Sequence, residues 1–346
     1  MKGRGSISNQ INPYHSQQYD FENEYDIDEP KYPSSIPTQY IPVFPKSILS
    51  KNDSPDIPFT YSINPYQGCE HGCAYCYARN SHHYWGFGTG LDFESKIMVK
   101  KNAPQLLEKA FLKPTWVPQT IALSGNTDCY QPAENKFHIT RNLLKVFLRF
   151  GNPAGIITKN SLVTRDKDIL TELARENLVR VIFTITSLDE KLRRALEPRT
   201  STAAAKLKAI QQLSNLNIST GVMMGPIIPG LNDHEIDPIL RHAAEAGAVQ
   251  ASYTMIRLNG QLSGIFEKWL DENYPDRKQK ILHKIKQAHD GKLNDNRWGR
   301  RMRGEGKISD VVSTMFKHQR NKYFGQQEVI SLSTDRFRKN GNLSLF

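Results

Sequence analysis

Three cysteines on one short stretch are the side chains of this sequence best suited to chemistry. Cys69, Cys73 and Cys76 lie in GCEHGCAYCY (68–77), with the spacing C-x3-C-x2-C. A structural zinc site takes four ligands, and a ferredoxin cluster takes four cysteines. Three thiolates on one loop instead indicate a [4Fe–4S] cluster with one iron open to another ligand. A Cys3His zinc site is the alternative interpretation. Its fourth ligand would be one of His71, His82 and His83.

The elements that must position these cysteines follow from hydrophobic periodicity. From about residue 60, short apolar or β-branched runs alternate with amphipathic stretches. Strands are expected at 61–65, 120–124, 155–158, 179–186, 220–225 and 250–256. Helices are expected near 103–112, 138–150, 166–177, 189–197, 202–215, 232–247 and 263–274. Strand followed by helix, repeated six times, predicts an α/β fold with a parallel sheet and right-handed crossovers. Six units are too few for a complete eight-stranded barrel. A partial (β/α)6 barrel is therefore expected, with a doubly wound open sheet as the alternative.

The flanking segments have different compositions. Residues 1–58 are rich in Pro, Ser, Asn, Gln and Tyr and predict an extended, partly disordered N-terminal arm. Residues 59–275 form the expected core, and residues 276–346 a basic helical C-terminal region and tail. Within that region, 277–303 hold ten Lys or Arg against two Asp.

Composition and charge indicate where the protein is located and what kind of partner it binds. No run of eighteen apolar residues occurs, so no membrane span or membrane partner is expected. The polar N-terminus does not resemble a secretory signal, and a cytoplasmic, reducing location is expected. Cysteines there are more often ligands or catalysts than disulfides. The formal net charge of +11 favours a polyanionic partner, nucleic acid first.

Polar residues follow the expected strands, at the edge where ligands bind in parallel βα folds. After the second strand come Ser124, Asn126 and Thr127. Lys159 follows the third strand and supplies a cation that a buried carboxylate would need. Ser187 follows the fourth strand; it is also spaced to form a capping box with the glutamate three residues later.

At the cysteine loop the sequence resembles the radical SAM superfamily, whose signature is C-x3-C-x-aromatic-C after the first barrel strand. Four segments resemble its spore photoproduct lyase-like ("DNA repair photolyase") branch: SPDIP (54–58), SINPY (62–66), TDCYQP (127–132) and PIIPGLND (226–233). The resemblance implies an iron–sulfur enzyme, lyase-like or of another reaction. A [4Fe–4S] cluster would cleave S-adenosylmethionine (SAM) reductively to a 5′-deoxyadenosyl radical. A one-electron reductant of flavodoxin or ferredoxin type is implied as its partner.

The resemblance also implies roles for individual residues. Ser124, Asn126 and Thr127 would meet the methionine amino group, Lys159 the SAM carboxylate, and Ser187 the ribose or carboxylate. Two further residues, Tyr75 and Arg199, are assigned to the cofactor site from their own position and chemistry and not from the resemblance. Tyr75 would pack on the cluster or approach the adenine. Arg199 would bind a carboxylate with both arms of its guanidinium, or else form a surface ion pair with Glu197.

Cys129 has two open interpretations. In spore photoproduct lyase a cysteine soon after the second strand supplies a hydrogen atom to the product radical. Aligned through Asp128, that position falls on Gly125 here, and Cys129 lies four residues downstream. Cys129 is the catalytic candidate if its thiol faces the pocket. Otherwise it is a small buried thiol, because free cysteine is among the most buried residue types.

Three hypotheses for the function follow. The first is a radical SAM enzyme that acts on nucleic acid, based on the resemblance and on the basic segment 277–303. The second is a radical SAM enzyme that modifies a peptide or protein. The third is a non-enzymatic iron–sulfur protein that binds nucleic acid.

Overall fold

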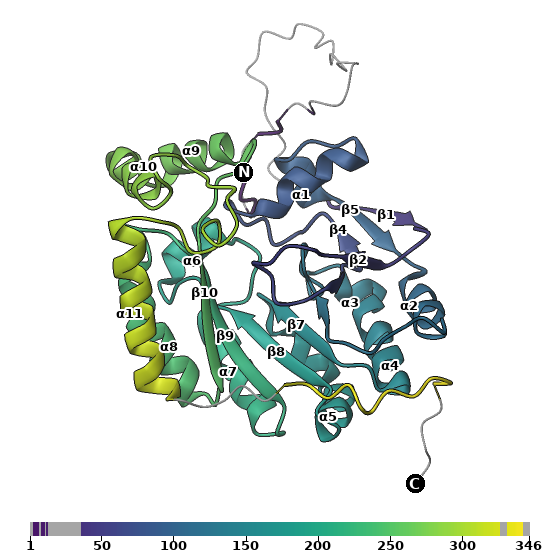
Figure 1. Cartoon of the computed structure of the whole chain (residues 1–346). Coiled ribbons are helices and arrows are strands. Elements are labelled where there is room, and N and C mark those ends of the chain that lie inside the picture. Colours follow the sequence, from purple (N-terminus) through teal and green to yellow (C-terminus); the bar gives the residue numbers. More distant parts are fainter. Residues whose placement is uncertain (1–2, 7, 11, 13–35, 326–330, 342–346) are drawn as a thin grey trace, which may run out of the picture.

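The main sheet has the strand order β10-β9-β8-β7-β6-β3-β2. The computed structural model describes residues 3–6, 8–10, 12, 36–325 and 331–341. Six strands run parallel and match the six expected: β3 (Tyr61–Ile63), β6 (Ile121–Leu123), β7 (Ala154–Thr158), β8 (Val179–Thr184), β9 (Ser219–Ile227) and β10 (Gln250–Met255). β2 (Leu49–Lys51) pairs antiparallel with β3 at one edge. The sheet is curved and open between β2 and β10, so the expected partial barrel is confirmed (Figure 1).

Helices between the strands cover the outer face of this sheet (Figure 1). They are α2 (Ala103–Phe111), α3 (Glu134–Phe137), α4 (Ile139–Phe150), α5 (Lys167–Arg175), α6 (Glu190–Leu196), α7 (Ala203–Ser214) and α8 (Ile236–Glu245). The helix α9 (Leu262–Asn273) follows the last strand, β10. In α4, Leu143, Leu144, Phe147 and Phe150 are buried, which is the i, i+3/i+4 stripe of a helix packed on a core. The helix ends at Gly151, whose φ of 63° is the left-handed conformation of a helix C-cap.

A second, three-stranded sheet lies beside the main one and was not expected. Its order is β1-β5-β4, with β1 (Gln39–Val43) parallel to β5 (Lys96–Lys100) and β4 (Tyr66–Gln67) antiparallel to it. The short helix α1 (Leu91–Ser95) leads into β5, and the 3-10 helix η1 (Tyr77–Trp85) precedes α1. Because β1 and β2 both lie before residue 59, the described part of the predicted arm supplies a strand to each sheet. The disorder predicted for that arm falls largely on residues 13–35, outside the described residues.

The C-terminal region adds the helices α10 (Lys278–Gln287) and α11 (Lys307–Phe324). α11 packs along α8, where the Tyr323 hydroxyl donates to Asp237 at 2.8 Å (Figure 1). Three further 3-10 turns complete the described elements: η2 (Ser161–Asp166), η3 (Asp233–Glu235) and η4 (Pro275–Arg277). The described residues contain no helix with the length and apolar character of a membrane span. The division at residues 58 and 275 stays a prediction.

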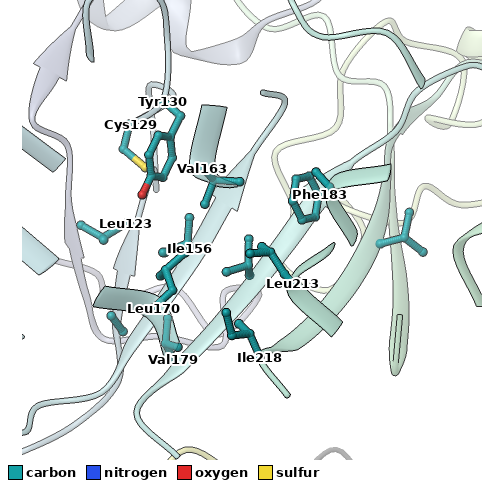
Figure 2. Close-up of a cluster of buried hydrophobic side chains, with 14 of the residues drawn as sticks. Leu123, Cys129, Tyr130, Ile156, Val163, Leu170, Val179, Phe183, Leu213 and Ile218 are labelled. Carbon is teal, nitrogen blue, oxygen red and sulfur yellow. The ribbon is translucent and has the colours of Figure 1, made fainter. Parts of the chain in front are cut away.

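The hydrophobic core has two main parts. The larger fills the space between the curved sheet and its helices (Figure 2). The smaller joins the cysteine segment to α6, α9 and α10: Ala74 and Tyr75 pack with Leu196, Phe266 and other apolar residues. The segment that carries the cysteines is therefore anchored to α6 and to the helices that follow β10.

Candidate active site

The cluster loop (residues 68–77) runs from β4 to η1 and carries the three cysteines. Cys69 and Cys73 are buried, and Cys76 is half-buried. Backbone hydrogen bonds fix the loop at both ends: the Cys69 N–H donates to Phe93 O at 2.8 Å, and the Ala74 N–H donates to Leu196 O at 2.9 Å. Gly68 and Gly72 have φ values of 80° and 66°. Glycine takes this left-handed conformation at little cost, which lets the loop turn sharply between the cysteines.

The three thiols are free and lie close enough to influence one another electrostatically. Burial raises the pKa of the Cys69 thiol, and Asp128, Cys73 and Cys76 raise it further. Thiolates bound to iron are deprotonated by the metal, so a cation at this loop would remove that penalty. The chemistry of the donor set thus fits an iron–sulfur cluster, in which each thiolate binds its own iron.

The zinc alternative lacks support in the same region. Among the described residues, no three His, Cys, Asp or Glu side chains could hold one metal ion. His82 Nε2 lies 3.1 Å from Asp92 O, and His83 Nε2 lies 3.1 Å from the Gln261 side-chain oxygen. His71 lies against Asp128 and Asn160. Each candidate fourth ligand therefore has another polar neighbour.

Asp128 connects the loop after β6 to two other parts of the site. It accepts hydrogen bonds from the Thr158 hydroxyl at 2.8 Å and the Lys159 N–H at 2.7 Å, both at the end of β7. It also accepts the Tyr130 N–H at 2.8 Å and lies 3.4 Å from His71 Nδ1 of the cluster loop. Burial alone would raise the pKa of Asp128, but His71 and the N–H donors lower it below its ordinary value. The sequence did not single out Asp128 as a site residue; its position after the second strand was the available signal.

Gln131 was also missed. Its side-chain oxygen accepts the Glu70 N–H at 3.0 Å, and its amide donates to Gly68 O at 3.1 Å. Gln131 is fully buried, so both bonds are shielded from water. One side chain from the β6 loop therefore holds the cluster loop on both sides of Cys69.

Lys159 lies at the end of β7 as predicted and reaches the cluster loop. Its amine is 3.4 Å from Gly225 O and 5.8 Å from the centre of the Tyr75 ring. Its positive charge opposes the effect of burial on the pKa of Cys73 and Cys76. The structure therefore brings together the predicted cation, the predicted aromatic residue and the cysteines.

A buried carboxylate, Glu197, lies behind Tyr75. It accepts hydrogen bonds from the Tyr75 hydroxyl and from the Thr186 hydroxyl, and the buried Lys206 amine lies 3.5 Å away. Burial would raise the pKa of Glu197, but Lys206 and Lys159 bring it to about 2. The side chain is therefore a carboxylate in neutral solution, and its hydrogen bond directs the Tyr75 hydroxyl away from solvent.

Ser124, Asn126 and Thr127 shape the loop after β6. Ser124 has a φ of 75°, and its hydroxyl accepts the Cys129 N–H at 2.7 Å. The Asn64 side-chain oxygen accepts the N–H groups of Asn126 and Thr127 at 2.7 and 3.2 Å. These bonds tie the loop to the end of β3. The Asn126 amide also donates to the Ser81 hydroxyl of η1 at 3.1 Å, which places this loop beside the cluster loop.

Two predictions about individual contacts are wrong. Ser187 does not cap α6: the N-cap is Asp189, and the buried Ser187 hydroxyl donates to Glu235 at 2.6 Å. Arg199 does not pair with Glu197, which pairs with Lys206 instead. Arg199 Nε donates to Gly3 O at 2.9 Å, so it binds the N-terminal segment.

Cys129 lies in the hydrophobic core. Its side chain is fully buried among residues that include Leu123, Tyr130 and Val163 (Figure 2). This position favours the interpretation as a small buried thiol. A role as hydrogen donor stays a prediction.

Comparisons with known proteins agree with this geometry. A family model described as the Radical SAM superfamily matches residues 63–243. An uncharacterized protein of Mycobacterium tuberculosis is 34% identical over 234 residues, covering 67% of this chain and 69% of its own length. An uncharacterized protein of Methanocaldococcus jannaschii is 30% identical over 65% of this chain and 80% of its own.

Spore photoproduct lyase shares the fold. Its complex with dinucleoside spore photoproduct superposes with a TM-score of 0.61 at 15% identity, over 83% of this chain and 80% of that chain. A mutant of the lyase with bound AdoMet and dinucleoside spore photoproduct gives 0.60 at 16% identity, with the same coverage. The family model covers more than half of this chain, and it matches from β3 to α8, the region that holds the cluster loop. The chain therefore belongs to the radical SAM superfamily and is an enzyme whose cofactors are a [4Fe–4S] cluster and SAM.

Proposed function

We propose that Cys69, Cys73 and Cys76 hold the [4Fe–4S] cluster of this enzyme and leave one iron without a protein ligand. The observation that carries this proposal is that three free thiols, two buried and one half-buried, lie on one loop within electrostatic range of one another, with Lys159 acting on two of them. When bound, the cluster supplies one electron that breaks a carbon–sulfur bond of SAM and yields the 5′-deoxyadenosyl radical. A flavodoxin- or ferredoxin-type protein is the proposed electron donor.

The side chains around the loop would bind and orient SAM. The Lys159 amine supplies a positive charge for the SAM carboxylate, and the loop of Ser124, Asn126 and Thr127 supplies polar groups for the amino group. Tyr75 presents its ring toward Lys159 while Glu197 holds its hydroxyl. The hydroxyl of Ser187 donates to Glu235 and accepts the Asp189 N–H at 3.0 Å, which leaves one oxygen lone pair for a ribose contact. Arg199 is engaged by the N-terminal segment, so we drop it from the proposed carboxylate contacts.

For the substrate we propose a nucleic acid or nucleotide. The net charge of +11 favours a polyanion, and spore photoproduct lyase, which has the same fold, has been solved with a dinucleoside photoproduct. Three exposed cations of the C-terminal region, Lys280, Lys286 and Arg303, take part in no ion pair among the described residues. Gly125 stands where spore photoproduct lyase has its hydrogen-donating cysteine, which weighs against the same repair reaction.

A peptide or protein substrate is the second candidate. It is favoured by the ion pairs of Arg297, Arg300 and Arg301, which neutralise much of the basic segment 277–303 within the chain. Superfamily membership removes the third hypothesis, a protein without enzymatic activity.

The test is turnover by anaerobically reconstituted, reduced protein. Wild-type protein should release 5′-deoxyadenosine from SAM, and Cys69→Ala, Cys73→Ala and Cys76→Ala should each lose both the visible absorbance of the cluster and SAM cleavage. Cys129→Ala is the matched control, because its thiol lies in the core, and it should keep the cluster. Loss of the cluster in Cys129→Ala together with its retention in the Cys76→Ala protein would overturn the ligand assignment.

The substrate class is tested in the same reactions. Single-stranded and duplex oligonucleotides should raise the yield of 5′-deoxyadenosine and acquire a mass change that requires SAM. If a peptide library raises the yield and acquires such a mass change while no oligonucleotide has any effect, the nucleic-acid proposal fails and the peptide candidate takes its place.

A further inference from the structure

The first described residues, 3–6, lie against the cluster loop, although nothing in their composition indicated a site. Residues 3–6, the N-terminal strap, have the sequence GRGS. Arg4, Gly5 and Ser6 are buried. The groups that hold the strap lie beside the cysteines in space. In the sequence they are far from the strap.

The carboxylate of Glu94 is the main anchor of the strap. Its two oxygens accept the Gly5 N–H at 3.0 Å and the Ser6 N–H at 2.8 Å. The same carboxylate pairs with Arg79 at 2.5 Å, and neither of these two side chains is exposed to solvent. A buried ion pair is stable only when its remaining hydrogen-bonding positions are filled, and the strap fills those of Glu94.

Arg79 carries this connection into the cluster loop. Its guanidinium donates to Cys73 O at 3.0 Å and to Gly72 O at 3.2 Å. The chain of contacts therefore runs from the strap through Glu94 and Arg79 to the backbone of a proposed cluster ligand. Each step is a charge-assisted hydrogen bond, the stronger kind in proteins.

The strap also touches the loop backbone directly. A Cβ added to Gly5 would lie 1.7 Å from Gly72 O, and one added to Gly72 would lie 2.7 Å from the Glu94 carboxylate. Only two residues without side chains can approach in this way. Arg199 closes the arrangement from the other side, because its side chain donates to Gly3 O at 2.9 Å while its N–H donates to His71 O at 3.4 Å.

We propose that the N-terminal strap is a positioning element of the cluster site, which fixes the backbone between Cys69 and Cys73 and covers it from solvent. The inference rests on the proposed role of these cysteines as cluster ligands. It assigns a role to Gly5, Glu94, Arg79 and Arg199, none of which would touch the cluster.

The test compares Gly5→Ala with Ser6→Ala in the full chain. Gly5→Ala places a methyl group against Gly72 O, whereas Ser6→Ala keeps the N–H that Glu94 accepts and loses only the bond from the Ser6 hydroxyl to Ser8 O. After anaerobic reconstitution, an iron chelator is added and the visible absorbance of the cluster is followed. Gly5→Ala should lose the cluster about tenfold faster or more, since leaving a buried charged group without its hydrogen bonds is costly. Ser6→Ala should match wild type.

Electron paramagnetic resonance of the reduced cluster separates positioning from general stability. If the loop is displaced, the g-values of the Gly5→Ala protein that still contains the cluster should shift. If the variant is only less stable, its g-values should equal those of wild type. Equal decay rates for the two variants, or wild-type g-values in the cluster-loaded Gly5→Ala protein, would overturn the proposal.

Hydrogen exchange tests the role of the strap independently of the assignment of the cluster ligands. In cluster-free protein, the amides of Cys69 and Ala74 should exchange faster in Gly5→Ala than in Ser6→Ala, with unchanged protection in β8 and β9. If wild-type protein binds no cluster, the ligand assignment fails and this comparison alone decides on the strap. If Gly5→Ala does not fold, Arg4→Gln replaces it, because Arg4 donates to Glu94 O and Ile36 O rather than to the crowded glycines. Wild-type exchange in Arg4→Gln would then refute the strap.

Discussion

At the scale of residues, the site combines buried charges that compensate one another. Glu197 pairs with Lys206, Glu94 pairs with Arg79, and Asp128 is held by N–H donors and His71. Lys159 differs from these cations, since its amine has only a backbone carbonyl at 3.4 Å among its described hydrogen-bond partners. This leaves Lys159 available for an anionic ligand.

Replacing Lys159 by Ala should weaken SAM binding by about tenfold or more, because a hydrogen bond to a charged group contributes about 1.5–3 kcal/mol. The dissociation constant is measured by anaerobic equilibrium dialysis with cluster-loaded protein. Lys191→Ala is the control, because Lys191 is exposed on α6 and its side chain has no described ion pair. An unchanged dissociation constant in Lys159→Ala would remove this residue from the SAM site.

The sequence predicts those site residues whose role can be recognised from neighbouring positions in the chain. The spacing of Cys69, Cys73 and Cys76 is visible within one loop, and Lys159 follows a recognisable strand. Glu197 could not be found in this way, because its partner Tyr75 lies 122 residues away. Gln131 likewise acts on Gly68, 63 residues earlier. Polar residues of this kind acquire their roles only when the sheet brings distant loops together.

At the scale of elements, the basic segment of the C-terminal region docks onto the rest of the chain. Arg301 donates to Asp56 at 2.7 Å, and the Gly299 N–H donates to the same carboxylate at 2.6 Å. Arg297 bonds Asp295 at 2.6 Å, and Arg300 bonds Glu305 at 2.5 Å. The Arg301 contact joins the segment after β2 to the segment after α10, and β2 and β10 are opposite edges of the open sheet.

Two triple variants separate docking from nucleic-acid binding. Replacing Arg297, Arg300 and Arg301 by Gln should lower the melting temperature, by about 2–4 °C for each kcal/mol lost, and change nucleic-acid affinity little. Replacing Lys280, Lys286 and Arg303 by Gln should leave the melting temperature nearly unchanged. The second variant should also weaken binding and reduce the slope of log affinity against log salt by about 2–3.

Calorimetry and binding titrations at several salt concentrations make this comparison. The assignment is contradicted if the first variant loses affinity without losing stability. If neither variant nor wild type binds any oligonucleotide at about 50 mM salt, where phosphate contacts are strong, the nucleic-acid proposal fails.

The main elements could be predicted because their signals are periodic and local. Most of the six parallel strands are apolar runs followed by an amphipathic helix, and all six were found within a few residues. The second sheet could not be found. β4 has two residues, and β1 is recognisable only through its pairing with β5, which starts 57 residues after it, Gln39 facing Lys96. Strands of this kind depend on tertiary contacts rather than on local preference.

At the scale of the whole molecule, buried neutral histidines make the fold sensitive to acid. Burial lowers the pKa of His82 from 6.5 to about 4, against a smaller opposing effect of Asp92. Burial also lowers the pKa of His289, a fully buried residue. Both groups bind protons more tightly in the unfolded chain than in the folded one. Their contribution to stability is therefore complete above pH 6.5 and is lost as the pH falls toward their folded-state values.

Cluster-free wild-type protein should lose about 3 kcal/mol from His82 alone as the pH falls from 6.5 to about 4. His82→Gln removes this titration, so its stability should depend less on pH over that interval. Urea denaturation across this range measures both proteins. Parallel curves for wild type and His82→Gln would show that His82 does not titrate as its burial requires.

The strap also fixes an order of events during synthesis. Gly3 leaves the ribosome before Arg199, which binds it and follows 196 residues later. Chains are made at about 5–20 residues per second, so the strap waits on the order of 10 seconds or more for its last partner. During that interval the backbone around Cys73 has no complete cover. The strap is therefore made well before the residue that completes its contacts.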